Sequence, residues 1–451
     1  MKPLARQLWG ILPASLQQRV ANLEAPIARR LARGVLWSAT GSVLSRALNI
    51  VATIVIARLL GEVEYGHVGM IQSTVDLFNA FAGIGLSYTA TKHIAELHQL
   101  DRARTGRIIA MTSVVSWLSG GVIALTLMIG APWLAETTLH APELTSLLRV
   151  GAWILLFGVI NSAQSGVLSG FEAFDVKARV TVVGAAANVL LTIVGVILGG
   201  AMGMVYGLVL GAAALCAMNA IAIHRQLRKV RIDVSIGSWW QEARLVATFG
   251  LPAMASSLII APVHWACNTM LVRTPGGFAE LGIYNATNQW FNSILFLPSV
   301  VSVVSIPLLS SLIGQGQWAD VRRVTWKSVR LNALVLAPVI VMAALSPWIM
   351  PLYGPGFAGS EFVLALNLAS AFLVVLFTPI WPMLLAAGKT RAVLFMNVGW
   401  SAILLGLTYV LVPYGALGMV IARFVAYVFH VGWMFSYARH VLIANTRRGL
   451  P

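Results

Sequence analysis

Runs of about twenty apolar residues recur along this chain from residue 35 to residue 437, and they constrain the fold more than any other feature. Each run is long enough to cross roughly 30 Å of hydrocarbon as a helix, and only helices and closed barrels satisfy every backbone polar group in lipid. Of the 451 residues, 58% are apolar and only 10% are charged, whereas a soluble domain carries roughly 25% charged residues. The sequence therefore predicts an all-α polytopic membrane protein.

Twelve transmembrane helices are expected, joined by connections too short to hold a further domain. The predicted spans are residues 35–57, 66–90, 108–130, 146–168, 180–199, 203–223, 246–271, 283–312, 331–350, 362–384, 393–412 and 417–437. The organisation that follows is a cytoplasmic N-terminal extension (1–33), a first six-helix lobe (34–223), a cytoplasmic inter-lobe loop (224–245), a second six-helix lobe (246–437) and a cytoplasmic C-terminal tail (438–451).

The formal net charge of +16 reflects membrane topology. All but five of the 31 lysines and arginines fall in the two tails and in alternate loops. Such a bias marks the cytoplasmic side of a membrane protein, so both termini are predicted to be cytoplasmic. The charges lie where they set topology and attract anionic lipid headgroups, and they do not predict nucleic-acid binding.

Weak self-similarity relates the two predicted lobes. The segment around Gly66 can be aligned with the segment around Gly282, and "GAMGMVYG" (200–207) resembles "GALGMVIA" (415–422). These matches occur in the same order at corresponding spans, which indicates a duplicated six-helix unit of the kind found in secondary transporters. Because each unit begins on the inside, the repeat is predicted to be parallel, about an axis along the membrane normal.

Two charged residues are predicted to lie deep in the membrane. Arg46 is about 18 Å from the outer end of the first span and Asp76 about 15 Å from the outer end of the second. A charge at mid-bilayer costs at least ~2.5 kcal/mol, so both side chains must face protein or water, and pairing with each other would offset this cost. The pair could fix the two helices, or it could line a transport cavity.

Other polar residues within or beside the spans are further candidates for a cavity lining. A guanidinium suits phosphate because its planar fork donates two parallel hydrogen bonds. Arg423 lies in the last span, and Arg273 ends the seventh span, where it could also extend to the interface. One face of the eighth span is polar and is expected to border water; it carries Asn288, Gln289 and Asn292.

The seventh span carries candidates for coupling and gating. His264 is either an interior histidine or a proton carrier. Pro252 and Pro262 each remove a helical hydrogen bond. They are either ordinary kinks or the point at which this span bends during gating.

Several other chemistries are not supported by the sequence. "AAGKT" (386–390) ends like a phosphate-binding loop, but Met383 stands where that loop needs glycine. No histidine–cysteine cluster has the spacing of metal ligands, and no outward loop is long enough to carry the catalytic groups of a membrane polymerase or glycan ligase. We therefore expect a transporter with no metal and no cofactor.

Three segments carry a resemblance to a known family. They are "IARLLGEVEYGHVGMIQS", then "GIGLSYTATKHIAEL" (83–97) and "GVLSGFEAFDVKA" (166–178). They resemble the lipid-linked oligosaccharide flippases of bacterial polysaccharide synthesis, the O-antigen-type flippases. These flippases belong to the multidrug/oligosaccharidyl-lipid/polysaccharide exporter superfamily. "FGLPAMASSL" and "VPYGALGMVIA" in the second half agree in outline.

The resemblance implies two lobes around a central cavity that alternates between inward- and outward-open states in the bacterial inner membrane. The implied cargo is a polyprenyl-diphosphate-linked oligosaccharide, moved to the outer leaflet for surface polysaccharide such as lipopolysaccharide or exopolysaccharide. In this hypothesis Arg46 attracts the diphosphate, Asp76 positions Arg46 and senses H⁺ or Na⁺, and Arg423 contributes from the other lobe. Membrane lipids and polysaccharide polymerase or assembly proteins are the implied partners.

Three alternatives remain at the level of sequence. One is a multidrug–cation antiporter of the same superfamily, which should favour acidic over basic groups within the membrane. Two arginines against one aspartate inside the spans favour an anionic cargo instead. The others are a membrane-embedded enzyme of polysaccharide synthesis and a scaffold that transports nothing.

Overall fold

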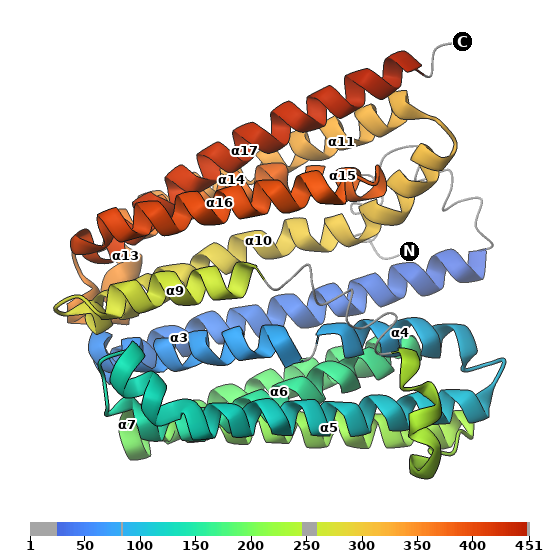
Figure 1. Cartoon of the computed structure of the whole chain (residues 1–451), viewed down its shortest axis with the longest axis horizontal. Helices are drawn as coiled ribbons and strands as arrows, with labels where there is room; N and C mark the ends of the chain where they lie inside the picture. The colour runs from blue at the N-terminus through green and yellow to red at the C-terminus, as the bar shows by residue number, and fades with distance from the viewer. Residues whose placement is uncertain (1–24, 83, 246–258, 449–451) are drawn as a thin grey trace.

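The computed structural model describes residues 25–82, 84–245 and 259–448, and they are almost wholly helical (Figure 1). The first half of the described chain contains α3 (Ala25–Ala82), α4 (Ile84–Leu97), α5 (Arg102–Trp133), η1 (Leu134–Thr138), α6 (Leu144–Gly170), α7 (Phe174–Val230) and η2 (Ile236–Glu242). The second half contains α9 (Ile260–Val272), α10 (Gly277–Gly314), α11 (Trp318–Ala333), α12 (Leu336–Ala344), α13 (Ser346–Ile349), η4 (Met350–Tyr353), η5 (Pro355–Phe357), α14 (Glu361–Phe377), α15 (Ile380–Ala386), α16 (Thr390–Leu411), η6 (Val412–Tyr414) and α17 (Gly415–Arg448).

Within the described residues, seven helical segments are long and apolar enough to cross a membrane. Three of them, Val43–Phe81, Phe174–Val230 and Thr390–Asn445, have 39, 57 and 56 residues. A straight helix needs only about 20 residues to cross a bilayer, so each is long enough for more than one crossing. The predicted all-helical polytopic membrane protein is confirmed. The predicted N-terminal extension lies largely outside the described residues, and its last part, from Ala25, is the start of α3.

Helix α7, with 57 residues, is a hairpin of two packed limbs. Its backbone leaves helical geometry at Gly199 and Gly200. A side chain at Gly203 would collide with the carbonyl of Gly195, and one at Gly211 with Asn188. These pairs lie at equal distances on either side of the break, as they must in an antiparallel hairpin. The small-residue stripe of the second limb thus lets the two limbs pack backbone to backbone.

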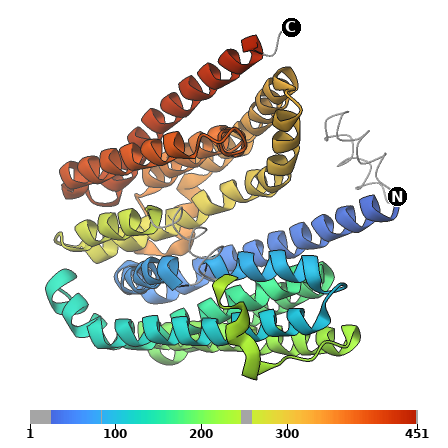
Figure 2. The same ribbon diagram turned by 45° about the vertical axis from the view of Figure 1, so that its right-hand side comes forward.

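Helix α3 lies at the boundary between the two halves. It also turns back on itself, at Gly61. It packs against α7 of the first half and against α10 and α9 of the second half. In Figures 1 and 2 the two groups of helices adjoin near the α3 turn and diverge towards the end at which α3 begins and α17 ends.

The two halves make direct backbone contact where α3 crosses α10, here called the glycine crossing. A side chain at Gly66 would collide with the carbonyl oxygen of Phe278, and a side chain at Gly282 would collide with that of Glu62. In each helix the colliding carbonyl lies four residues before the glycine. The contact is therefore reciprocal, and only glycine allows the two backbones to approach so closely.

Two glutamates next to the glycine crossing each accept a hydrogen bond from a helix N-terminus in their own half. A Glu64 carboxylate oxygen accepts a hydrogen bond from the backbone N–H of Ala201 at 3.1 Å, and one of Glu280 accepts from that of Ala416 at 2.7 Å. Each N–H belongs to a helical limb that follows a glycine in the same unusual conformation: φ 56°, ψ −138° at Gly200 and φ 64°, ψ −143° at Gly415. A carboxylate stabilises such an N-terminus through its orphan N–H groups.

The chain that follows α7 is anchored on the first half. The buried carboxylate of Glu242 in η2 receives Arg104 Nε at 3.2 Å and Arg107 Nη2 at 3.4 Å, both from α5. The carbonyl of Asp233 packs directly on Gly106. The segment predicted as an inter-lobe loop is therefore held, up to Glu242, against the first half.

Candidate substrate cavity

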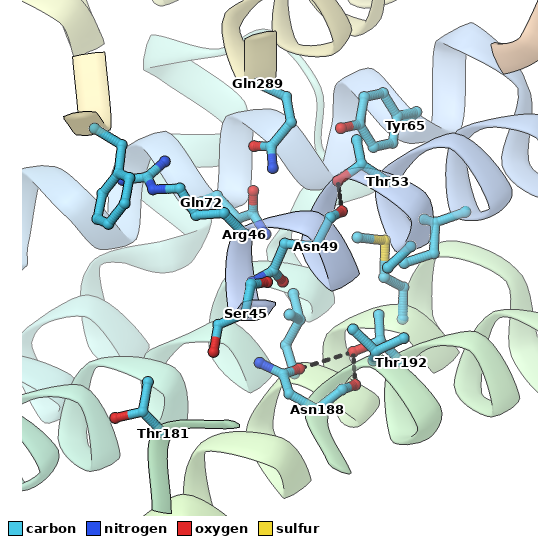
Figure 3. A pocket seen from close by; sticks show the side chains of 16 residues that line it. Ser45, Arg46, Asn49, Thr53, Tyr65, Gln72, Thr181, Asn188, Thr192 and Gln289 are labelled. Carbon is cyan, nitrogen blue, oxygen red and sulfur yellow. Dashed lines mark hydrogen bonds between the residues drawn. The ribbon is translucent and has the colours of Figure 1, made fainter. Parts of the chain in front are cut away.

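A cavity of about 510 Å³ lies between α3, α7 and α10 (Figure 3). Its polar lining is Ser45, Arg46, Asn49, Thr53, Tyr65, Gln72, Thr181, Asn188, Thr192 and Gln289, and its apolar lining is Ala52, Ile56, Val189, Met204, Leu208 and Phe296. A volume of this size is ordinary for a small-molecule site. Both limbs of α3 and both limbs of α7 contribute, so the hairpins that form the fold also form the cavity wall.

Hydroxyl groups of the lining are held by the helices that carry them. Thr53 Oγ1 donates to the carbonyl of Asn49 at 2.7 Å, and Thr192 Oγ1 lies 2.6 Å from the carbonyl and 3.0 Å from the amide oxygen of Asn188. Because the hydroxyl hydrogens are used locally, these side chains have preferred orientations and present acceptor lone pairs. The wall is thus a fixed polar surface.

Arg46 reaches from α3 across the boundary to the second half. Its Nη1 donates to the main-chain carbonyl of Asn292 at 3.2 Å, and its Cζ lies 4.9 Å from the ring centroid of Phe296. The side chain is half-buried. Among the described residues that line the cavity it is the single cation and none is acidic, and no ion pair of these described residues includes Arg46. A guanidinium has five N–H donors, so most of its capacity is left for an anion.

The predicted pair of Arg46 and Asp76 is wrong. Among the described residues Asp76 makes neither an ion pair nor a hydrogen bond, and its side chain is exposed. The two residues lie at similar depth, fifteen positions on either side of the turn at Gly61. Arg46 is directed at α10, however, and equal depth on two limbs does not ensure that two side chains face each other. Asp76 lies one helical turn beyond Gln72, on the same face of α3.

Arg423 does not line the cavity; it lies in a buried cluster of the second half. Its side chain is 4% exposed, and Nη1 donates to the amide oxygens of Asn288 at 2.8 Å and Asn367 at 3.1 Å. Its Cζ lies 4.9 Å from the ring centroid of Tyr284 and 4.6 Å from that of Phe291. Amide oxygens and aromatic faces are adequate partners for a buried cation. The prediction of Arg423 and Asn288 as cavity residues is therefore wrong for this conformation.

Arg273 is exposed at the end of α9 and contacts the first half. Its Nε donates to the carbonyl of Thr138 at 2.7 Å and its Nη2 to that of Thr137 at 3.2 Å, both in η1 of the first half. Arg273 thus joins α9 to η1 and is not a cavity residue, which corrects that prediction. Of the three predicted residues of α10, Gln289 lines the cavity, while the exposed Asn292 meets Arg46 through its main chain.

Two further candidates, His264 and Pro262, are not part of the cavity lining. His264 in α9 packs edge-on against Trp400, with ring centroids 5.8 Å apart. Pro262 falls in the first turn of α9, where proline is tolerated. Pro252 lies outside the described residues. Bending of this span during gating stays a prediction.

Among the lining residues that the sequence analysis did not single out are Tyr65, Gln72, Thr53, Thr181 and Thr192. A signal for them was present in the spacing. Ser45, Asn49 and Thr53 recur every four residues, and Thr181, Asn188 and Thr192 follow at intervals of seven and four. A polar stripe at this spacing on an apolar helix marks one face that does not meet lipid.

The fold and cavity define a class: a multi-pass membrane protein whose helices surround a polar, cationic cavity. Comparison with known families gives the particular family. The chain belongs to the family described as "Polysaccharide biosynthesis protein", which matches residues 31–313 and hence more than half of the sequence.

Individual relatives are distant in sequence. The chain is 24% identical over 274 residues to "EPS I polysaccharide export inner membrane protein EpsE" of Ralstonia solanacearum; this match covers 60% of the chain and 61% of the relative, so it spans less than two thirds of that protein. It is 22% identical to "Lipid III flippase" of Escherichia coli (strain K12) over 427 residues, covering 93% of the chain and 99% of the relative.

A solved structure shares the fold. The chain superimposes with a TM-score of 0.78 on the inward-facing conformation of a multidrug resistance MATE family transporter of the MOP superfamily, at 16% sequence identity, covering 89% of the chain and 96% of that structure. At this identity the likeness establishes the fold alone.

Proposed function

We propose that this protein is a flippase that moves a polyprenyl-diphosphate-linked oligosaccharide from the cytoplasmic to the outer leaflet of the bacterial inner membrane. The observation that carries the proposal is the cavity lining: its described residues contribute one guanidinium and no carboxylate, together with amides and hydroxyls. A guanidinium binds diphosphate oxygens, and amides and hydroxyls bind sugars. The relatives named as a polysaccharide export protein and a lipid III flippase support the same class of cargo.

The proposed architecture is twelve membrane crossings in two six-helix lobes related by a parallel repeat. Two observations support the repeat. The glycine crossing is reciprocal about Gly66 and Gly282, which the sequence alignment had paired. Glu64 and Glu280, two residues before these glycines, each bind the N-terminus of an equivalent limb. A twofold relation between the lobes explains why both pairs recur.

The proposed orientation places the glycine crossing on the outer side and the chain termini in the cytoplasm. The start of α3 and the end of α17 lie at one end of the molecule (Figure 1), and the loops there carry the excess of basic residues. The lobes touch at the crossing and diverge towards the termini, so this conformation would be open to the cytoplasm. The likeness to an inward-facing transporter supports this assignment.

The steps of transport follow from this arrangement. The diphosphate enters from the cytoplasmic side and binds Arg46, the sugars lie against the amides and hydroxyls, and the lipid tail stays in the bilayer. Opening the glycine crossing while the opposite ends of the lobes approach each other would then expose the cargo to the outer leaflet. Only differential binding of the two states by cargo or ion can bias this exchange. Polysaccharide polymerase or assembly proteins would receive the product.

The proposal is tested in a deletion strain profiled by mass spectrometry for polyprenyl-diphosphate-linked oligosaccharides and assayed for surface glycan. Accumulation of the lipid-linked unit together with loss of surface glycan is expected, and the accumulating species identifies the cargo. Intact surface glycan combined with increased sensitivity to cationic drugs would instead identify an antiporter.

We propose that ion coupling uses Asp76. Its carboxylate is exposed and lies one turn beyond the cavity residue Gln72 on the same helix face, so an ion could reach it from the cavity. His264 packs against Trp400 and is less accessible to an ion.

The Asp76→Asn variant is expected to lose the acceleration of transport by an imposed H⁺ or Na⁺ gradient in proteoliposomes, while transport down a cargo gradient continues. Removing the carboxylate proposed to exchange the ion removes the coupling and leaves the cargo site. The His264→Gln variant serves as the control and should respond to the gradient as the wild type does. A gradient response retained by Asp76→Asn would contradict this assignment.

A further inference from the structure

A second cation stands beyond the cavity on α7. Lys177, Thr181, Asn188 and Thr192 follow at intervals of four, seven and four residues, so they share one face of the first limb. The last three line the cavity, with Thr181 at the edge of the labelled group in Figure 3. Lys177 is one turn nearer the start of α7, the end that we assign to the cytoplasm.

The ammonium group of Lys177 has spare binding capacity. Its Nζ donates to Ser169 Oγ at 2.8 Å, and its side chain is partly buried. The adjacent carboxylate of Asp175 pairs with Arg179 at 3.3 Å, and the ion pairs of the described chain do not include Lys177. An ammonium has three N–H donors and is costly to bury without an anion.

Helix stability does not account for a lysine at this position. Lys177 is the fourth residue of α7, near the positive end of the helix dipole, where an acidic residue is favoured and a cation is not. The one hydrogen bond of its ammonium group joins α6 to α7 through the neutral hydroxyl of Ser169. An arriving anion would satisfy both the ammonium and the positive end of the helix.

The distance between Lys177 and Arg46 suggests that an anion entering from the cytoplasm meets Lys177 first and Arg46 second. Lys177 is twenty-two residues from the break at Gly199, and Arg46 is fifteen from the turn at Gly61. The two breaks lie at the same level, because Glu64 binds Ala201. At 1.5 Å per residue, Lys177 is about 10 Å closer to the cytoplasmic end than Arg46.

We propose that Lys177 is the entry site for the diphosphate of the lipid-linked cargo, which it receives at the cytoplasmic mouth before Arg46 binds it in the cavity. This inference rests on the proposed function. It adds a specificity-determining residue that acts before the cargo reaches the cavity.

The test measures the affinity of the purified full-length protein, in phosphatidylcholine nanodiscs, for undecaprenyl diphosphate and for undecaprenol. The wild type should prefer the diphosphate, and Lys177→Ala should weaken its binding at least about fivefold by loss of a charge-assisted hydrogen bond. Lys177→Arg should retain affinity. Arg179→Ala, which removes an exposed cation two residues away, and Ser169→Ala, which removes the tie between α6 and α7, should bind as the wild type does.

Each other outcome overturns a defined part of this account. If the wild type binds undecaprenol as tightly as the diphosphate, the proposed function fails and the inference fails with it. If the wild type prefers the diphosphate but Lys177→Ala is unaffected, or if Ser169→Ala is equally weak, only the entry site is wrong. Equal loss of phosphatidylglycerol binding by Lys177→Ala would mark a general anionic-lipid site and would also overturn the inference.

Discussion

Replacing Arg46 by alanine is expected to reduce transport of the lipid-linked oligosaccharide at least about tenfold. The substitution removes the single cation among the described residues of the cavity lining, and hydrogen bonds to charged groups contribute about 1.5–3 kcal/mol each, where 1.4 kcal/mol corresponds to a factor of ten. The measurement is complementation of the deletion strain, with surface glycan and accumulated lipid-linked unit quantified together at matched protein levels in the membrane.

Arg58→Ala is the matched control for this experiment. Arg58 lies twelve residues further along the same limb of α3, is exposed and does not line the cavity, so surface glycan should be normal. Arg46→Lys keeps the charge but not the planar fork, and an intermediate activity is expected. Full complementation by Arg46→Ala would show that the diphosphate is bound elsewhere.

Replacing Gly66 by leucine is expected to open the outer side. The new side chain would collide with the carbonyl of Phe278 and prevent the two backbones from meeting. Overpacking costs about 1–3 kcal/mol, which shifts the population away from the closed arrangement about 5- to 150-fold. Gly66→Leu should therefore increase labelling of Thr192→Cys by a membrane-impermeant maleimide added from outside. The background is a chain with Cys216 and Cys267 replaced by alanine, since both native cysteines are free.

Gly121→Leu provides the control for this second experiment. Gly121 is also a glycine within a membrane helix, α5, but a Cβ atom added there would meet no atom within 4 Å. Labelling from outside should match that of the parent protein. Unchanged labelling in Gly66→Leu would show that the glycine crossing is not the outer barrier.

The apolar periodicity was sufficient to predict an all-helical membrane protein, because the length and composition of a span are set by the bilayer itself. Depth was also predictable, since it follows from counting residues from a helix end. What the sequence could not supply was the direction of a side chain around its helix. Arg46 and Asp76 have equal depth, yet Arg46 contacts Asn292 and Phe296 of α10. To predict whether Arg46 and Asp76 pair, one must know how each limb of α3 is rotated about its own axis. That rotation is determined by packing against other helices.

The direction of the Arg423 side chain could not be predicted for the same reason. An arginine in a span is expected to seek water or an acidic partner, but this one is accommodated by two amide oxygens and two aromatic rings that come from α10 and α14. Partners so far apart in the chain leave no local signal. The weak internal sequence similarity, by contrast, includes residues with a defined structural role. Gly66 and Gly282 permit a close approach, and the glycines before Ala201 and Ala416 permit a left-handed backbone.

The cavity wall is unevenly shared between the halves. All of its described residues except Gln289 and Phe296 come from α3 and α7, that is, from the first half. No described residue of α11 to α17 is part of this lining. Mutations that retune the enclosed surface for a different glycan would accumulate in the first half, and the second half could meanwhile remain under selection for motion alone. Adaptation to a new surface polymer and preservation of the transport cycle would then be tasks of separate parts of one gene.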